Sequence, residues 1–211
     1  MPLLTLALVG PVPSALFLAT VCYAIGALLA LALMRRGYPH DSPGLCNIVT
    51  LIRLGLTASL LAPLLAPSAA WAVISLAVMV LILDGADGWL ARREGRVSGF
   101  GARFDMEVDA ALGLILALNA WGSGAVGPVV LLLGLPRYLF AAAGRVWPWM
   151  AAPLPERAGR KAVCVAQIAT LIALQAPFVE GELALGLVLA AAGALLWSFG
   201  RDTLWLWRAR P

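Results

Sequence analysis

Four aspartates with helical spacing stand out in an otherwise apolar chain. Asp84 and Asp87 are three residues apart, and Asp105 and Asp109 are four residues apart. Either spacing places both carboxylates on one face of a helix. Clustered carboxylates repel one another unless a cation is bound, and all-oxygen ligands suit hard divalent ions such as Mg²⁺ or Mn²⁺. The only histidine, His40, lies in a predicted loop. The pattern therefore predicts a two-metal site that acts on phosphate groups.

The two aspartate pairs are expected to meet because a short loop joins their helices. Asp84 and Asp87 fall near the carboxyl end of one apolar helix, where the helix dipole disfavours negative charge unless a cation compensates. Asp105 and Asp109 fall at the amino-terminal end of the next helix, where the dipole favours them. An antiparallel hairpin would bring the four carboxylates to one level of the bilayer. Glu107 lies about 200° round the helix from Asp105, so it is left outside the predicted site.

Composition identifies the elements that must position these acids. The chain of 211 residues is 62% hydrophobic and 12% charged, and its mean hydropathy is +0.93. A water-soluble domain of this size could not bury so much apolar surface, so we expect an all-α, polytopic integral membrane helical bundle. A span needs about 20 apolar residues. Seven segments qualify: 14–34, 48–66, 70–91, 103–121, 127–146, 161–178 and 183–206.

The basic residues indicate the orientation of the bundle. Every lysine and arginine lies in one alternate set of connections or in a helix leading to it. The positive-inside rule places that set, and the aspartates near it, in the cytoplasm. Segment 14–34 could instead lie along the membrane surface, but it lacks the polar face that such a helix needs, which favours a true span. The three cysteines lack metal-ligand spacing, and no nucleic-acid partner is expected.

The spacing from residue 84 to residue 109 resembles a family signature. These residues read D-x2-D-G-x2-A-R-x8-G-x3-D-x3-D without a mismatch. The pattern is similar to the signature of the CDP-alcohol phosphotransferase family, integral membrane phospholipid synthases. The stretch CNIVTLIR at 46–53 is similar to the helix-opening P-N-x-x-T-x-x-R of that family, with Cys46 where proline is usual.

This resemblance implies a fold, a reaction and a location. We expect a six-helix core domain at 46–211, preceded by an extension at 1–45 that carries an extra hydrophobic helix at 14–34. The implied reaction transfers a phosphatidyl group from a CDP-linked lipid, CDP-diacylglycerol, to the hydroxyl of an alcohol, and releases CMP. The resemblance also implies a homodimer, surrounded by membrane lipids. We expect a bacterial inner membrane, with the active site facing the cytoplasm.

The resemblance assigns roles residue by residue. Asp84, Asp87, Asp105 and Asp109 would hold Mg²⁺ or Mn²⁺, and Asp109 would also take the proton from the acceptor hydroxyl. Residues at the CDP moiety would be Asn47, Thr50, Gly88, Ala91, Arg92 and Gly101.

Three basic residues are candidates for binding the acceptor. The spacing from Arg137 to Arg145 is similar to the R-E-x6-R of phosphatidylglycerophosphate synthases, except that Tyr138 replaces the glutamate. Lys161 lies in 158–167, which is similar to their G-K-x-K-T-x-x-Q but departs from it at three positions. Glycerol 3-phosphate is therefore the first choice of acceptor, and inositol phosphate, a phospholipid, serine and choline remain open.

Two other classes of protein are considered. A cation transporter would spread its acids through the bilayer, whereas the four aspartates lie at one cytoplasmic level and no acid continues outward from them until Glu180 and Glu182. A non-catalytic relative would be expected to have lost at least one signature position. Both alternatives are weaker than the transferase hypothesis.

Overall fold

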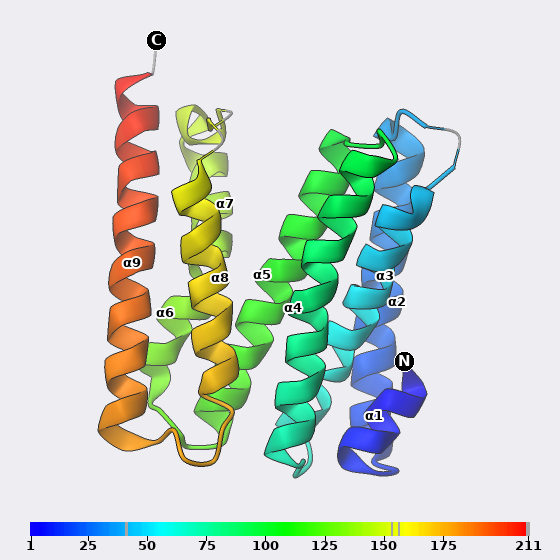
Figure 1. Ribbon diagram of the computed structural model, residues 1–211, viewed down its shortest axis with the longest axis vertical. Coiled ribbons are helices and arrows are strands. Elements are labelled where there is room, and N and C mark those ends of the chain that lie inside the picture. Colours follow the sequence, from blue (N-terminus) through cyan, green and yellow to red (C-terminus); the bar gives the residue numbers. More distant parts are fainter. Residues whose placement is uncertain (41, 153, 156, 210–211) are drawn as a thin grey trace. The chain divides into compact units, whose positions relative to one another are not determined.

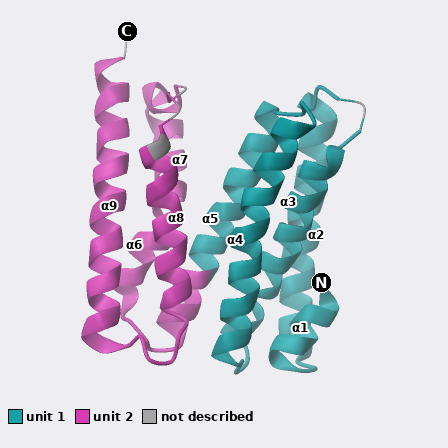
Figure 2. Ribbon diagram, viewed as in Figure 1, with its two compact units in different colours: residues 1–115 teal, residues 116–211 magenta. Residues whose placement is uncertain are grey.

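The computed structural model describes residues 1–40, 42–152, 154–155 and 157–209. Within these ranges the chain forms nine α-helices and three short 3-10 helices, and no strand (Figure 1). The predicted all-α fold is confirmed. The chain divides into two compact units, Met1–Ile115 and Leu116–Pro211, which are described separately (Figure 2).

The first unit contains the helices that carry the aspartates. Its elements are α1 (Pro2–Val9), α2 (Pro13–Gly37), α3 (Gly44–Ser59), η1 (Ala62–Leu64), α4 (Ala70–Arg93) and the first part of α5 (Gly99–Gly122). Helix α3 packs against both α2 and α4. Helix α1 was not predicted from the sequence, and it packs on α2 and α3.

Helix α2 lies alongside α3 through small residues (Figure 1). A Cβ atom at Gly26 would lie 2.9 Å from a methyl group of Leu54, and one at Gly55 would lie 3.4 Å from the ring of Tyr23. Small residues at such contacts let helices approach closely in a membrane. Helix α2 also exposes large apolar side chains, including Phe17 at 72%. Because α2 packs along α3 and its exterior is apolar, a membrane span is favoured over a helix that lies on the membrane surface.

Helix α3 has its polar residues inside and its apolar residues outside. Asn47, Thr50 and Arg53 are at most 4% exposed, whereas Ile48 and Ile52 are 43% and 52% exposed. The buried residues recur at a spacing of three and so share one face of the helix. A soluble helix would show the opposite arrangement, so this pattern fits a membrane helix whose polar face is turned toward the protein interior.

The second unit contains η2 (Pro128–Val130), α6 (Leu131–Gly134), α7 (Pro136–Val146), η3 (Pro148–Ala151), α8 (Ala158–Ala173) and α9 (Gly181–Arg208). Helix α8 packs on α9. The sequence predicts a span over 127–146, and the structure shows a bend of 61° within this segment, between Pro128–Gly134 and Pro136–Val146. Pro136 explains the break, since it lacks a backbone N–H and restricts the residue before it.

The chain is a membrane protein. By length and composition, four helical stretches in the described residues are apolar enough to cross a bilayer: Pro13–Gly37, Gly44–Leu64, Ala70–Arg93 and Gly181–Arg208. The bent pair in the second unit would make a fifth. The other two predicted spans coincide mostly with α5, which carries the acids near its start, and α8, which has 16 residues. The number of seven spans therefore stays a prediction.

Candidate active site

A tight hairpin connects the two aspartate-bearing helices. Gly95 adopts a positive φ of 63° in the turn after α4, a conformation that glycine adopts without steric cost. Three residues later the hydroxyl of Ser98 accepts a hydrogen bond from the backbone N–H of Gly101 at 3.0 Å, which caps the start of α5. The chain thus reverses within five residues, as the sequence predicts.

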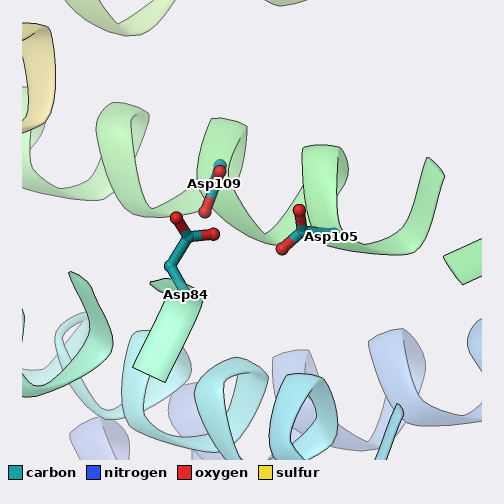
Figure 3. A group of neighbouring side chains, drawn as sticks. All are labelled: Asp84, Asp105 and Asp109. Atoms are coloured by element: carbon teal, nitrogen blue, oxygen red, sulfur yellow. The ribbon is translucent and has the colours of Figure 1, made fainter. Parts of the chain in front are cut away.

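Three carboxylates converge at this hairpin. Asp84 on α4 and Asp105 and Asp109 on α5 each offer an oxygen, and the three oxygens lie within 4.8 Å of one another. Figure 3 shows the three carboxyl groups pointing toward one another, with Asp105 and Asp109 on successive turns of α5. Hard divalent cations prefer carboxylate oxygens, so this donor set fits Mg²⁺ or Mn²⁺.

Arg53 of α3 lies at the centre of all four aspartates. One terminal nitrogen, Nη1, contacts Asp87 at 2.6 Å and also pairs with Asp105. The other, Nη2, contacts Asp84 at 2.8 Å and also pairs with Asp109. Sequence reasoning did not assign Arg53 to the site, although it was seen within the helix-opening motif. The available signal was an arginine inside an apolar span, where ionisable residues are costly.

Asp87 differs from the other three aspartates in its surroundings. It is 4% exposed and lies outside the group of three converging carboxylates. Its Oδ2 lies 3.0 Å from the hydroxyl of Thr50 and 2.6 Å from Arg53. The Thr50 hydroxyl is also 3.1 Å from the carbonyl oxygen of Cys46. Asp87 therefore joins α4 to the buried polar face of α3.

Some of the residues expected at the CDP moiety lie at the starts of α3 and α5. Asn47 donates a hydrogen bond from its side-chain amide to the carbonyl of Pro43 at 2.6 Å. A Cβ atom on Gly101 would lie 3.5 Å from the Asn47 side-chain oxygen, so the start of α5 meets the start of α3. Gly88 faces the guanidinium of Arg92, to which a Cβ atom would approach within 3.6 Å.

A hollow of about 460 Å³ opens at the start of α3. Its walls include Ser42, Gly44, Ile48, Glu94 and Arg96. Arg96 donates to the Ser42 carbonyl at 2.6 Å and contacts the Ser42 hydroxyl at 2.8 Å. These contacts tie the turn after α4 to the segment before α3.

The three candidate acceptor residues lie in the second unit. Arg137 follows the break before α7, Arg145 lies in the last turn of α7, and Lys161 lies in the first turn of α8. Arg145 and Lys161 are exposed, and Arg137 is half-buried.

An ion pair fixes the start of α8 against α9. Nε of Arg160 lies 2.8 Å from a carboxylate oxygen of Asp202, which is 4% exposed. Arg157 contacts the other oxygen of the same carboxylate at 3.7 Å. Arg160 also donates to the carbonyl of Pro155 at 3.0 Å. Lys161 therefore follows a residue whose side chain is held in place.

Fold and site together define a polytopic membrane protein with an acidic centre built from its helices. Residues 44–198 match the family model described as CDP-alcohol phosphatidyltransferase, a range that covers more than half of the chain. The chain therefore belongs to the CDP-alcohol phosphatidyltransferase family. Members are transferases for substituted phosphate groups in phospholipid biosynthesis, and they use a CDP-alcohol and an acceptor. No curated protein and no solved structure matches the chain. Family membership sets aside the transporter alternative.

Proposed function

We propose that the protein transfers a phosphatidyl group from CDP-diacylglycerol to the hydroxyl of an alcohol, with glycerol 3-phosphate as the acceptor. The observation that carries this proposal is the convergence of Asp84, Asp105 and Asp109. These residues are three of the four aspartates of the signature, and they come from two helices of the first unit. The arrangement supports a reaction at a diphosphate. Several carboxylates close together repel one another unless cations are bound, and bound cations attract phosphate groups.

The four aspartates of the signature would hold Mg²⁺ or Mn²⁺ in a two-metal site. When bound, such ions neutralise charge on the diphosphate and on the departing CMP. The contacts of Arg53 use one oxygen of each aspartate, so the second oxygen of each carboxylate can serve as a ligand. Asp87, being the most buried of the four, would be the ligand closest to the protein interior.

Asp109 would act as the general base. The acceptor oxygen forms a bond to the phosphorus that carries the lipid, and the bond from that phosphorus to the CMP oxygen breaks. CMP departs with the electron pair of the broken bond, and the acceptor's proton passes to a carboxylate oxygen of Asp109. An alcohol is a weak nucleophile at neutral pH, so a carboxylate within reach of the hydroxyl assists the attack.

The nucleotide would bind at the meeting point of α3 and α5. Asn47 and Gly101 lie next to each other there, and the hollow beside Pro43 offers space. Thr50 would support nucleotide binding indirectly, through the contact of its hydroxyl with Asp87. Gly88, Ala91 and Arg92 belong to the same signature and complete the expected CDP-binding set, which is taken from the family resemblance.

The acceptor assignment depends on Arg137, Arg145 and Lys161. Guanidinium and ammonium groups suit a phosphate-bearing acceptor. Arg137 and Arg145 are eight residues apart on α7, or roughly 12 Å along the helix axis. Their long side chains can both reach one phosphate only if they point toward each other. Inositol phosphate, a phospholipid, serine and choline are the competing acceptors.

The setting of the enzyme is also part of the proposal. The basic connections support a site that faces the cytoplasm, and a bacterial inner membrane is the expected location. The catalytic domain would comprise 46–211, with 1–45 as an extension that contributes the span in α2. A homodimer is the expected assembly.

One experiment tests the reaction and the acceptor together. The purified protein is given CDP-diacylglycerol and Mg²⁺ or Mn²⁺, and CMP release is recorded with each acceptor in turn. We expect release with glycerol 3-phosphate, and none after the metal is chelated. Release only with another acceptor would reassign the acceptor, and no release with any acceptor would overturn the proposed function.

A further inference from the structure

We propose that Arg53 is the positioning residue of the metal site: from the buried side, its guanidinium holds one oxygen of each of the four aspartates, so that their remaining oxygens converge on the metal ions. The inference rests on the proposed function, because it assumes that the aspartates are metal ligands.

The direction from which Arg53 approaches supports this role. The side chain of Arg53 is fully buried, and that of Asp87 is 4% exposed. The side chains of Asp84, Asp105 and Asp109 are 20%, 38% and 41% exposed. The guanidinium therefore contacts the carboxylates from inside, while their accessible side faces outward. Since Arg53 has no exposed surface, it acts through the aspartates and does not touch a substrate.

The geometry of the guanidinium suits this task. A guanidinium is planar and presents its donors in a rigid fork, so one group can fix several carboxylates at once. Here each terminal nitrogen pairs with one aspartate of α4 and one of α5. Arg53 therefore links both arms of the hairpin to α3.

The cost of the arrangement argues against a purely structural role. Replacing a buried ion pair by apolar residues of similar volume is often neutral or stabilising, so stability alone does not explain five buried or half-buried charges. The Nε atom of Arg53 is buried and makes no hydrogen bond within the described part of the chain, which adds to the cost. One guanidinium also offsets only one of the four negative charges, and the remaining charge is what divalent cations would balance.

Binding of Mn²⁺ to the purified full-length protein, without lipid substrate, tests the inference. Titration followed by electron paramagnetic resonance gives the Kd for wild type, Arg53→Met and Arg53→Lys. Removing a group that orients metal ligands weakens metal binding by roughly 10–100-fold. We expect a loss in this range for Arg53→Met. We expect a smaller loss for Arg53→Lys, because an ammonium keeps the charge but cannot span four carboxylates. Arg36→Met, at the exposed end of α2, is the matched control and should leave the Kd unchanged.

The outcomes separate the two proposals. If wild type binds Mn²⁺ and Arg53→Met binds it equally well or more tightly, Arg53 is a competitor of the metal and the inference is overturned, while the proposed function stands. If wild type binds Mn²⁺ as expected but releases no CMP with any acceptor, the proposed function fails independently. If Arg53→Met does not fold, the Kd of Arg53→Lys decides, and a value equal to that of wild type overturns the inference.

A thermal unfolding measurement distinguishes positioning from simple support of the fold. Each folded variant is heated in a chelator and in saturating Mn²⁺. A positioning role predicts that Mn²⁺ raises the unfolding temperature of Arg53→Lys less than that of wild type at the same concentration. An equal rise in both proteins would contradict it.

Discussion

The guanidinium of Arg53 and the carboxylate of Asp87 lie 2.6 Å apart, and both side chains are almost completely buried. This contact joins α3 to α4 at the depth where the two α5 aspartates also arrive. It brings the charge of Arg53, the last residue of the helix-opening motif at 46–53, to Asp87 in the first half of the signature. The acidic site is therefore built on an internal cation and does not consist of carboxylates alone.

The different surroundings of Asp87 and Asp84 predict different effects on stability. Asp87→Asn should lower the free energy of unfolding by about 1–3 kcal/mol, because it weakens a buried contact with Arg53 and alters one with Thr50. Asp84→Asn should cost less, since Asp84 is more exposed. Unfolding in detergent with a chelator present measures both without any contribution from metal. Equal losses would contradict the conclusion that Asp87 joins α4 to the buried polar face of α3.

The role of Asp109 predicts a loss of turnover with binding retained. Asp109→Asn should reduce CMP release by roughly 10²–10⁴-fold, the usual contribution of a general base. Binding of CDP-diacylglycerol, measured separately by titration, should be largely preserved. Glu107→Gln is the matched control, because Glu107 is exposed on the same helix, about 200° round the helix axis from Asp105. An active Asp109→Asn enzyme would remove Asp109 as the base.

Gly44 at the start of α3 is predicted to be intolerant of a side chain. Its φ is +72°, and a Cβ atom would lie 2.6 Å from the side chain of Arg96. Gly44→Ala should therefore destabilise the protein by about 1 kcal/mol or more in thermal unfolding. Gly37→Ala should be neutral or slightly stabilising, because a Cβ atom there meets nothing within 4 Å. If the two variants behaved alike, the strain argument would fail.

The pairing of Asp202 with Arg160 predicts that α9 holds the start of α8. Asp202→Ala should lower the free energy of unfolding by about 1–3 kcal/mol, because it removes the carboxylate that faces Arg160 and Arg157. Limited proteolysis should cleave the segment before α8 faster in this variant. Glu182→Gln, an exposed change in the first turn of α9, serves as the control. Unchanged proteolysis in Asp202→Ala would show that the pair is dispensable.

The acceptor hypothesis predicts a selective change in kinetics. Arg145→Ala and Lys161→Ala should each raise the KM for glycerol 3-phosphate by about tenfold or more, as expected for a lost charge-assisted hydrogen bond. The KM for CDP-diacylglycerol should change little. Arg208→Ala, in the last turn of α9, is the control for loss of a surface charge. A rise in the KM for the lipid alone would move these residues to the other substrate.

Much of the fold was accessible from the sequence, because a membrane imposes strong rules on composition. The lengths of the apolar segments predicted where the helices lie. Helices α2 and α4 match segments 14–34 and 70–91 closely. The bend within the predicted span over 127–146 was not foreseen, because an average over twenty residues does not detect a local break at Pro136. Helix α1 was missed because eight residues are too few for that pattern.

The sequence by itself determined which acidic residues can lie side by side. Spacing of three and four residues places each aspartate pair on one helical face, and a short loop forces the two helices into a hairpin. Those are local properties of the chain. Only the tertiary structure decided that Arg53 stands among the four aspartates and that Asp87 faces inward to Thr50. Arg53 lies 31 residues before Asp84 and 56 before Asp109. The position of its side chain therefore depends on how α3 packs against α4 and on the contacts that Arg53 makes with α5, which local spacing does not encode.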